Sequence, residues 1–175
     1  MRIARFLGVG AVLGLVLAGA AAAVVNGGSV TPNLGVAGIK LGMTRAQVIA
    51  RLGKPLFKNA NGFMQYGNDK KGVIFDVYLD TSTHPQRVRL LGISGTKFCL
   101  VGGGPCMMRA GGVGKLRKRY GNALVNVKLE DGEKVVWLKG KLKGCKVFTD
   151  FGEANRPAAA KIVMIFIGYQ SGHYC

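Results

Sequence analysis

The sequence predicts an α+β fold in which tandem repeats, each a short helix followed by antiparallel strands, form one curved sheet with the helices on one face. Short helical patterns that end at a glycine occur at residues 44–53 and 113–121, and strand-like apolar runs follow each of them. A sheet of this kind buries one face under its helices and leaves the other face open. We expect residues 38–101 to form the first helix-sheet repeat and residues 102–175 the second.

The N-terminal residues 1–23 are predicted to be a signal peptide. Arg2 and Arg5 precede an apolar run, and the small residues 18–23 follow it, which is the order typical of a segment cleaved on export. The alternative is a retained membrane anchor, because residues 6–25 are uncharged and close to the ~20 residues that a membrane span needs. Both interpretations predict an exported protein, either secreted or periplasmic, or held at the membrane by this segment.

A flexible leader is predicted at residues 24–37, which are rich in Gly, Asn, Ser and Pro. The first helix comes next. Thr44 suits its N-cap, Gln47 completes a capping box, and Gly53 and Pro55 end it. Its predicted apolar face is formed by Ala46, Ile49, Ala50 and Leu52.

Strands are expected after both helices. In the run 73–79, apolar residues alternate with a mixed set, so we expect one buried face and one mixed face. The second helix has a narrower apolar stripe at Val113, Leu116 and Tyr120. The eight expected strands are 62–66, 73–79, 87–93, 96–101, 123–129, 134–138, 145–151 and 161–169.

The four cysteines predict two disulfides in an exported domain, with three possible pairings. Cys99 and Cys106 flank a glycine-rich turn that allows them to meet, and Cys145 would then pair with Cys175. We expect no metal site, because the chain has no C-x-x-C spacing and its two histidines stand apart from the cysteines.

No catalytic site and no cofactor are expected. His84 lies in a predicted turn and His173 in the C-terminal tail, so neither has a predicted nucleophile beside it. The glycine-rich residues 111–115 lack the upstream glycine of a phosphate-binding loop and are followed by Leu116 where that motif needs Ser or Thr. A small secreted hydrolase is nevertheless kept as an alternative function.

The formal charge of the chain is +17, of which Arg2 and Arg5 supply two charges. Such a surface favours an acidic protein or an anionic envelope polymer or lipid as partner, while general solubility is the alternative explanation. Nucleic acid is not an expected partner, because no nucleic-acid-binding motif accompanies the charge and the protein is predicted to be exported. The candidate binding residues are Lys115, Arg117, Lys118, Arg119, Trp137, Lys139, Lys141 and Lys143.

Two expectations concern this set. Lys139, Lys141 and Lys143 alternate, so in an extended strand their side chains would point to one side. The apolar run 135–138 favours a core position for Trp137, and an exposed anchor is the alternative.

The segment Ile39-Lys-Leu-Gly-Met-Thr-Arg-Ala-Gln-Val48, followed by Leu52-Gly-Lys-Pro55, resembles the opening of the SmpA/OmlA-type small outer-membrane assembly lipoproteins. The β-lactamase inhibitor proteins use a similar helix-plus-sheet unit in tandem. The resemblance implies the fold more than the function, since it consists of turn glycines, a helix cap and a helix face. The assembly lipoproteins are acylated on an N-terminal cysteine, whereas the first cysteine here is Cys99.

The resemblance to the inhibitor proteins implies binding through the open face of the sheet. Those proteins use acidic and aromatic residues against their enzyme, so a basic chain would require an acidic partner. We therefore expect an exported, non-catalytic and inhibitor-like binding module whose open, basic sheet face engages an acidic protein or an anionic envelope component. A membrane-tethered scaffold for envelope assembly is the alternative.

Overall fold

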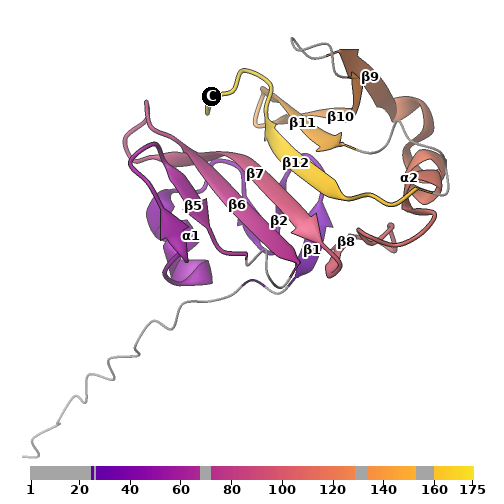
Figure 1. Ribbon diagram of the computed structural model, residues 1–175. Helices are drawn as coiled ribbons and strands as arrows, with labels where there is room; N and C mark the ends of the chain where they lie inside the picture. Colours follow the sequence, from indigo (N-terminus) through magenta and orange to yellow (C-terminus); the bar gives the residue numbers. More distant parts are fainter. Residues whose placement is uncertain (1–24, 26, 68–71, 129–133, 153–159) are drawn as a thin grey trace, which may run out of the picture.

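The computed structural model describes residues 25, 27–67, 72–128, 134–152 and 160–175. Strands make up 46% of the described residues and helices 15%. The fold is therefore mostly β and not a clear helix-plus-strand repeat, which corrects the predicted α+β class. The two helices, α1 (Arg45–Leu52) and α2 (Gly112–Tyr120), are too short to form a layer of their own and lie against sheet (Figure 1).

The main element is an eight-stranded antiparallel sheet of order β4-β5-β6-β7-β12-β11-β10-β9. The first four strands after α1 occupy one half of it, and the four strands after α2 occupy the other half. The halves meet where β7 pairs with β12, in a register that places Ile93 opposite Ile165 and Leu91 opposite Ile167. The strands are β4 (Phe57–Lys58), β5 (Phe63–Gln65), β6 (Val73–Asp80), β7 (Arg87–Gly95), β9 (Leu124–Lys128), β10 (Lys134–Leu142), β11 (Cys145–Phe151) and β12 (Met164–Tyr169).

A second, four-stranded sheet corrects the predicted flexible leader. Its order is β3-β2-β1-β8, formed by β1 (Gly28–Thr31), β2 (Gly35–Val36), β3 (Ile39–Lys40) and β8 (Phe98–Leu100). Val30 and Val36 are buried in the core, and β1 runs parallel to β8. The partner strand lies far along the chain, so local composition could not indicate that this segment is ordered.

Helix α1 confirms the predicted caps and changes the predicted face. Thr44 and Gln47 form the capping box, and Gly53 ends the helix with a φ of 74°. The buried side chains are Val48 and Leu52, whereas Ile49 is 36% exposed. Ala46 and Ala50 are exposed as well. A helix of two turns packs on the sheet with one narrow face. Residues four apart in sequence, here Val48 and Leu52, share that face.

Helix α2 begins close to its prediction, and its apolar stripe is confirmed. Val113 and Leu116 are fully buried, and the ring of Tyr120 stacks on Phe151 of β11 with centroids 6.3 Å apart. The Val113 N–H donates a hydrogen bond to the carbonyl oxygen of Ala160, which ties α2 to the segment that leads into β12. A 3-10 turn, Gly121–Ala123, then connects α2 to β9.

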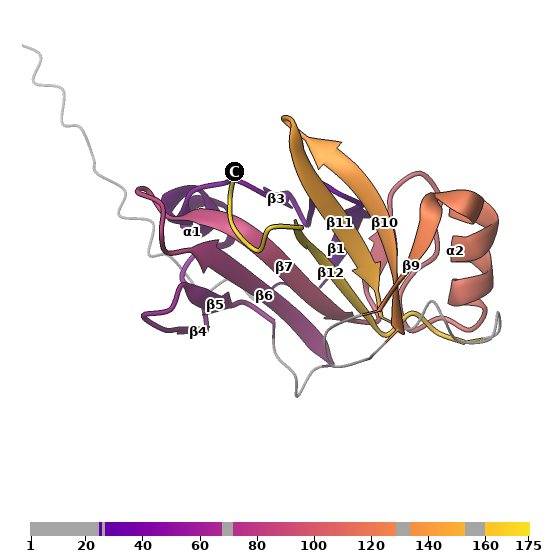
Figure 2. The ribbon, with the colours of Figure 1, turned by 90° about the horizontal axis from the view of Figure 1, so that it is seen from above.

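The helices and the small sheet lie on the same side of the main sheet. Besides the contact of Tyr120 with Phe151, the ring of Phe98 in β8 lies 6.4 Å from that of Phe75 in β6. The turn between β1 and β2 also packs on this side, where the Asn33 N–H donates to the hydroxyl of the buried Thr149. Within the described residues, no helix covers the opposite side of the main sheet, which faces the viewer in Figure 2.

The predicted disulfide pairing is confirmed. Cys99 bonds with Cys106 across the glycine-rich turn, and Cys145 bonds with Cys175 at the C-terminus. Two disulfides indicate an oxidising, non-cytoplasmic environment. The predicted signal peptide or anchor, residues 1–23, lies outside the described residues, and no helix in the described part is long and apolar enough to cross a membrane.

A buried carboxylate holds the C-terminal segment against the sheet. Asp80, which is 2% exposed, accepts hydrogen bonds from the Ser82 hydroxyl and amide and from the amide of Tyr174. The hydrogen bond from the Ser82 side chain is the main cause that lowers the pKa of Asp80 from 3.8 to about 2. Burial opposes this shift, and the backbone hydrogen bonds and nearby His173 add to it.

We predict that Asp80→Asn lowers the free energy of unfolding at pH 7 by about 2 kcal/mol, the stability that corresponds to the lowered pKa. The folded protein binds this proton more weakly than the unfolded chain does. The stabilisation is therefore complete above about pH 4 and disappears as the pH falls toward 2. Urea unfolding of both proteins between pH 2 and pH 7 measures the difference.

Asp76→Asn is the matched control. Burial raises the pKa of Asp76, so ionisation of that carboxyl weakens the fold at neutral pH and its replacement should not destabilise the protein there. A difference between wild type and Asp80→Asn that stays constant from pH 7 to pH 2 would contradict this explanation.

Candidate functional site

The side of the main sheet opposite the helices, which we call the outer face, is crossed by two rows of side chains in register. The central row contains one residue from each of the eight strands. The neighbouring row includes three further aromatic side chains. The central row is Phe57, Gln65, Asp76, Gly92, Phe166, Asp150, Trp137 and Val125, and the second row is Phe63, Tyr78, Leu90, Gly168, Phe148 and Lys139.

Five of the aromatic side chains of the outer face form two clusters. In the first, the rings of Phe57 and Tyr78 lie 5.9 and 5.1 Å from the ring of Phe63. In the second, Trp137 stacks on Phe148 with centroids 4.4 Å apart and an interplanar angle of 16°. Apart from Phe57, which is 54% exposed, these rings are half-buried.

Two glycines let side chains lie across the sheet between the clusters. A Cβ atom added to Gly92 would lie 2.9 Å from the ring of Phe166. One added to Gly168 would lie 2.7 Å from Leu90 Cδ1 and 3.2 Å from the ring of Phe148. Any larger residue at either position would displace these side chains. Because the glycines have no side chains of their own, the middle of the outer face is flat and apolar.

Polar groups on the outer face are partly desolvated. Burial raises the pKa of Asp76, and a hydrogen bond from Gln65 opposes that rise. Burial, and then the neighbouring Asp76, raise the pKa of Tyr78, while Arg89 opposes them. The indole N–H of Trp137 is buried and has no hydrogen-bond partner among the described residues. This buried N–H therefore carries the cost of an unsatisfied hydrogen bond.

Three of the predicted binding residues lie on the outer face. Trp137, Lys139 and Lys141 project from it along β10, and Trp137 is absent from the buried core, which corrects the core position favoured by its sequence context. Lys143 does not continue the ladder. It has a φ of 51° and lies in the turn between β10 and β11, because β10 ends at Leu142.

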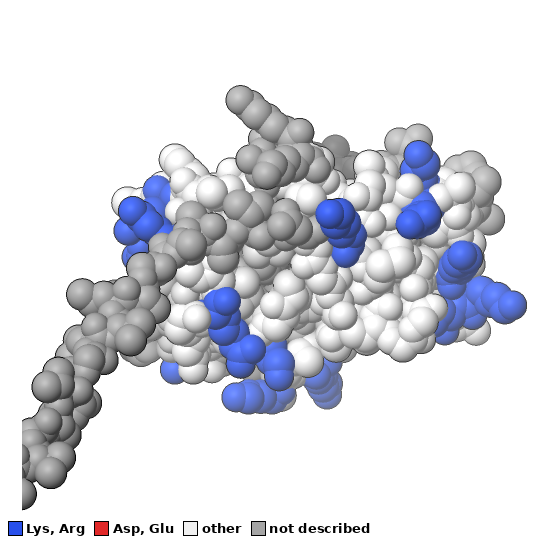
Figure 3. Space-filling view, turned by 90° about the horizontal axis from the view of Figure 1, so that it is seen from below, with Lys and Arg blue, Asp and Glu red and all other residues white. Residues whose placement is uncertain are grey.

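The other four predicted residues belong to a different surface. Lys115, Arg117, Lys118 and Arg119 are exposed on α2, on the side of the sheet that carries the core. Figure 3 views the molecule from the side of the small sheet, where Lys and Arg are widespread and no Asp or Glu is visible. The predicted basic patch is therefore two surfaces, and the outer face is aromatic with lysines at one end.

Sequence reasoning missed several aromatic residues of the outer face. Phe63, Tyr78, Phe148 and Phe166 contribute rings, and none of them was a predicted binding residue. In β11 the outward Phe148 alternates with the inward Val147 and Thr149, so both faces of the strand contain large or apolar side chains. The pairing register is the only signal that assigns the face, and it cannot be obtained from one strand alone.

The polar cluster at Asp80 has the residue types of a catalytic triad without the required geometry. His173 Nδ1 lies 3.5 Å from Asp80 Oδ2, but the hydroxyl of Ser82 donates to the same carboxylate and not to the histidine. The arrangement therefore gives Ser82 no base. Among the described residues, no group of three His, Cys, Asp or Glu side chains is placed to hold a metal ion.

Comparison of the chain with models of protein families, with curated proteins and with solved structures finds no significant match.

Trp137 is the single tryptophan of the chain, so its fluorescence reports directly on the outer face. We predict that acrylamide quenches it to an intermediate degree, because the ring is half-buried beside Phe148. Phe148→Leu should shift the emission to longer wavelength and increase quenching, since it removes the stacked ring. The core substitution Phe98→Leu, on the opposite side of the sheet, serves as control. An emission shielded from acrylamide in both variants would contradict the placement on the outer face.

Proposed function

We propose that the protein is an exported, non-catalytic binding module that uses the outer face of its eight-stranded sheet to bind an acidic protein. The observation that carries this proposal is the pair of aromatic clusters on a face that no described helix covers. Tyr, Trp and Phe are enriched at protein interfaces and contribute a large part of their binding energy.

The lysines of the β10–β11 hairpin, at one end of the outer face, support an acidic partner. Lys141 lies directly opposite Lys146 on neighbouring strands, and Lys139 is opposite Phe148. Like charges placed opposite one another destabilise a sheet, and a carboxylate on a partner would offset that repulsion. We therefore place the acidic part of the partner over the β10–β11 hairpin and an apolar part over the two aromatic clusters.

The order of the elements supports an organisation in two repeats. Each helix precedes four antiparallel strands of the main sheet, and the last of these in each set, β7 or β12, lies at its centre, while β8 of the small sheet follows the first set. The resemblance to the β-lactamase inhibitor proteins implies a tandem arrangement, and an inhibitor-like role is part of the proposal. The second candidate, a membrane-tethered envelope scaffold, depends on retention of residues 6–25, and mass analysis of the exported protein distinguishes the two.

The proposal is tested with two photoreactive variants of the full chain. One carries benzoylphenylalanine in place of Tyr78, on the outer face, and the other carries it in place of Ala46, exposed on α1. We expect crosslinking in the extracytoplasmic fraction of the native host to give an acidic protein from position 78 and not from position 46. Crosslinks from position 46 alone, or from neither position, would contradict the proposal.

The crosslinked partner is then purified and its affinity measured. Trp137→Ala should weaken binding by about 2 kcal/mol, roughly a 30-fold rise in Kd, because it removes a central aromatic anchor. Lys139→Glu/Lys141→Glu should weaken it further and make it less sensitive to salt. The charge-matched control is Lys54→Glu/Lys58→Glu, two exposed lysines near α1. An equal loss in both double variants would mean that only net charge is recognised.

A further inference from the structure

A basic groove runs between α2 and the glycine-rich loop that the Cys99–Cys106 disulfide closes. It consists of two adjoining hollows of about 630 and 440 Å³, which share Gly103, Gly104, Pro105 and Lys115. Arg109 contributes to the first hollow. Lys118 and Arg119 contribute to the second, and none of the lining residues is acidic.

A disulfide and two backbone hydrogen bonds tie down the loop side of the groove. Besides the disulfide, the amide of Leu100 donates to the carbonyl oxygen of Pro105, and the amide of Val101 donates to that of Val30 in β1. Gly102 and Gly103 have φ angles of 66° and 72°, which favour glycine. The described residues supply no acceptor to the amides of Gly103 and Gly104.

The helix side of the groove carries one fixed cation, Arg119, and two lysines that have no ion-pair partner among the described residues. Arg119 donates from Nη1 to the carbonyl oxygen of Gly102 at 3.0 Å, and a Cβ atom at Gly104 would come within 2.7 Å of the same nitrogen. Lys115 and Lys118 are exposed and form no ion pair with the described residues. They lie three residues apart on one helix face, where like charges repel.

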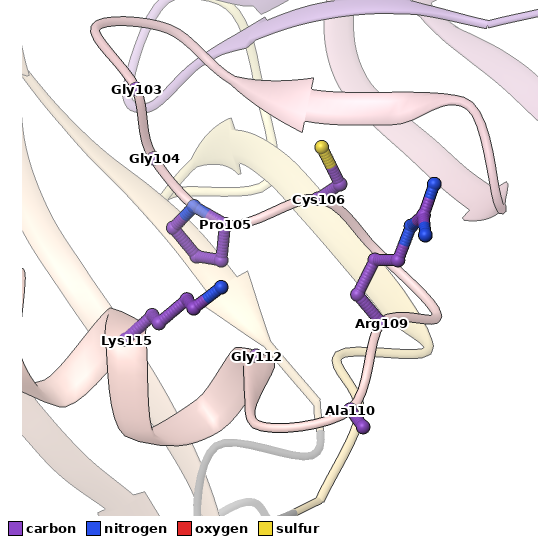
Figure 4. Close-up of a pocket in the computed structure, with 8 residues that line it drawn as sticks. All are labelled: Gly103, Gly104, Pro105, Cys106, Arg109, Ala110, Gly112 and Lys115. Carbon is purple, nitrogen blue, oxygen red and sulfur yellow. The ribbon is translucent and has the colours of Figure 1, made fainter.

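Figure 4 shows how the first hollow is arranged. The side chain of Lys115 reaches from α2 toward Pro105, and that of Arg109 lies on the other side of Pro105, beside Cys106. Lys115 borders both hollows, so it is placed between two positions for an anionic group. Arg and Lys together with free backbone amides are the donors that recognise phosphate oxygens.

We propose that this groove binds a linear polyanion through successive phosphate groups, with one group between Arg109 and Lys115 and the next between Lys115 and Lys118. This site is independent of the protein-binding role proposed for the outer face, since α2 lies on the opposite side of the main sheet. Arg119 positions the loop, and the other three cations contact the ligand.

The test uses tripolyphosphate as the probe, with the oxidised full chain and nitrogen-15 NMR. We expect the amide signals of Gly103, Gly104 and Lys115 to shift on titration. Tripolyphosphate should bind at least about tenfold more tightly than orthophosphate, because its second phosphate reaches the second hollow without a separate binding event. Equal affinities, or shifts centred away from the groove, would overturn the proposal.

Two double variants distinguish binding in the groove from attraction by the overall charge of the protein. Lys115→Gln/Lys118→Gln should raise the Kd for tripolyphosphate roughly tenfold, because two charge-assisted contacts are lost. Lys54→Gln/Lys58→Gln, which removes the same charge elsewhere on the surface, should leave it within about twofold. An equal loss in both variants would overturn the site in favour of unspecific attraction.

Two further probes test the ligand class. Citrate, which carries carboxylates and no phosphate, should shift the groove signals only weakly. Equally tight binding of citrate would show that the groove does not recognise phosphate specifically, which would overturn the proposal. Binding to phosphatidylglycerol vesicles without binding to tripolyphosphate would show that the ligand is a lipid surface and not a linear polyanion. Trp137 fluorescence should not respond to tripolyphosphate, so failure of the groove proposal and failure of the outer-face proposal give different results.

Discussion

The pairing of β7 with β12 is the constraint on which the rest of the structure depends. It joins the strands after α1 to those after α2, so eight strands share one core that includes Leu91, Ile93, Ile165 and Ile167. The same pairing brings the glycines and rings of the outer face into register across both halves. Two separate four-stranded sheets would have exposed edges and no continuous face.

Local signals explain which parts of the fold were predictable. The caps of α1, the alternation in β6 and the disulfide pairing depend on residues close in sequence or on a small number of alternatives. The small sheet depends on a parallel pairing of β1 with β8, about 70 residues away along the chain, which no local pattern indicates. The predicted leader was wrong for this reason.

The candidate site was predictable only in part, for a related reason. Sequence identified the basic residues, but Lys139 and Lys115 lie on opposite sides of the main sheet, and Lys143 lies in a turn. The aromatic residues that define the outer face alternate with apolar residues of the core, so composition alone does not separate the two faces. The two surfaces have different chemistry and lie on opposite sides of the main sheet, so a ligand on one would not block the other.

The most direct test of a partner on the outer face is hydroxyl-radical footprinting of the full chain, alone and in the extracytoplasmic fraction of its host, analysed by mass spectrometry. If the account is correct, oxidation of Tyr78, Phe148 and Trp137 falls in the presence of the partner, while that of Tyr120 on α2 is unchanged. Unchanged oxidation of the outer face, or protection confined to α2, would contradict the central claim.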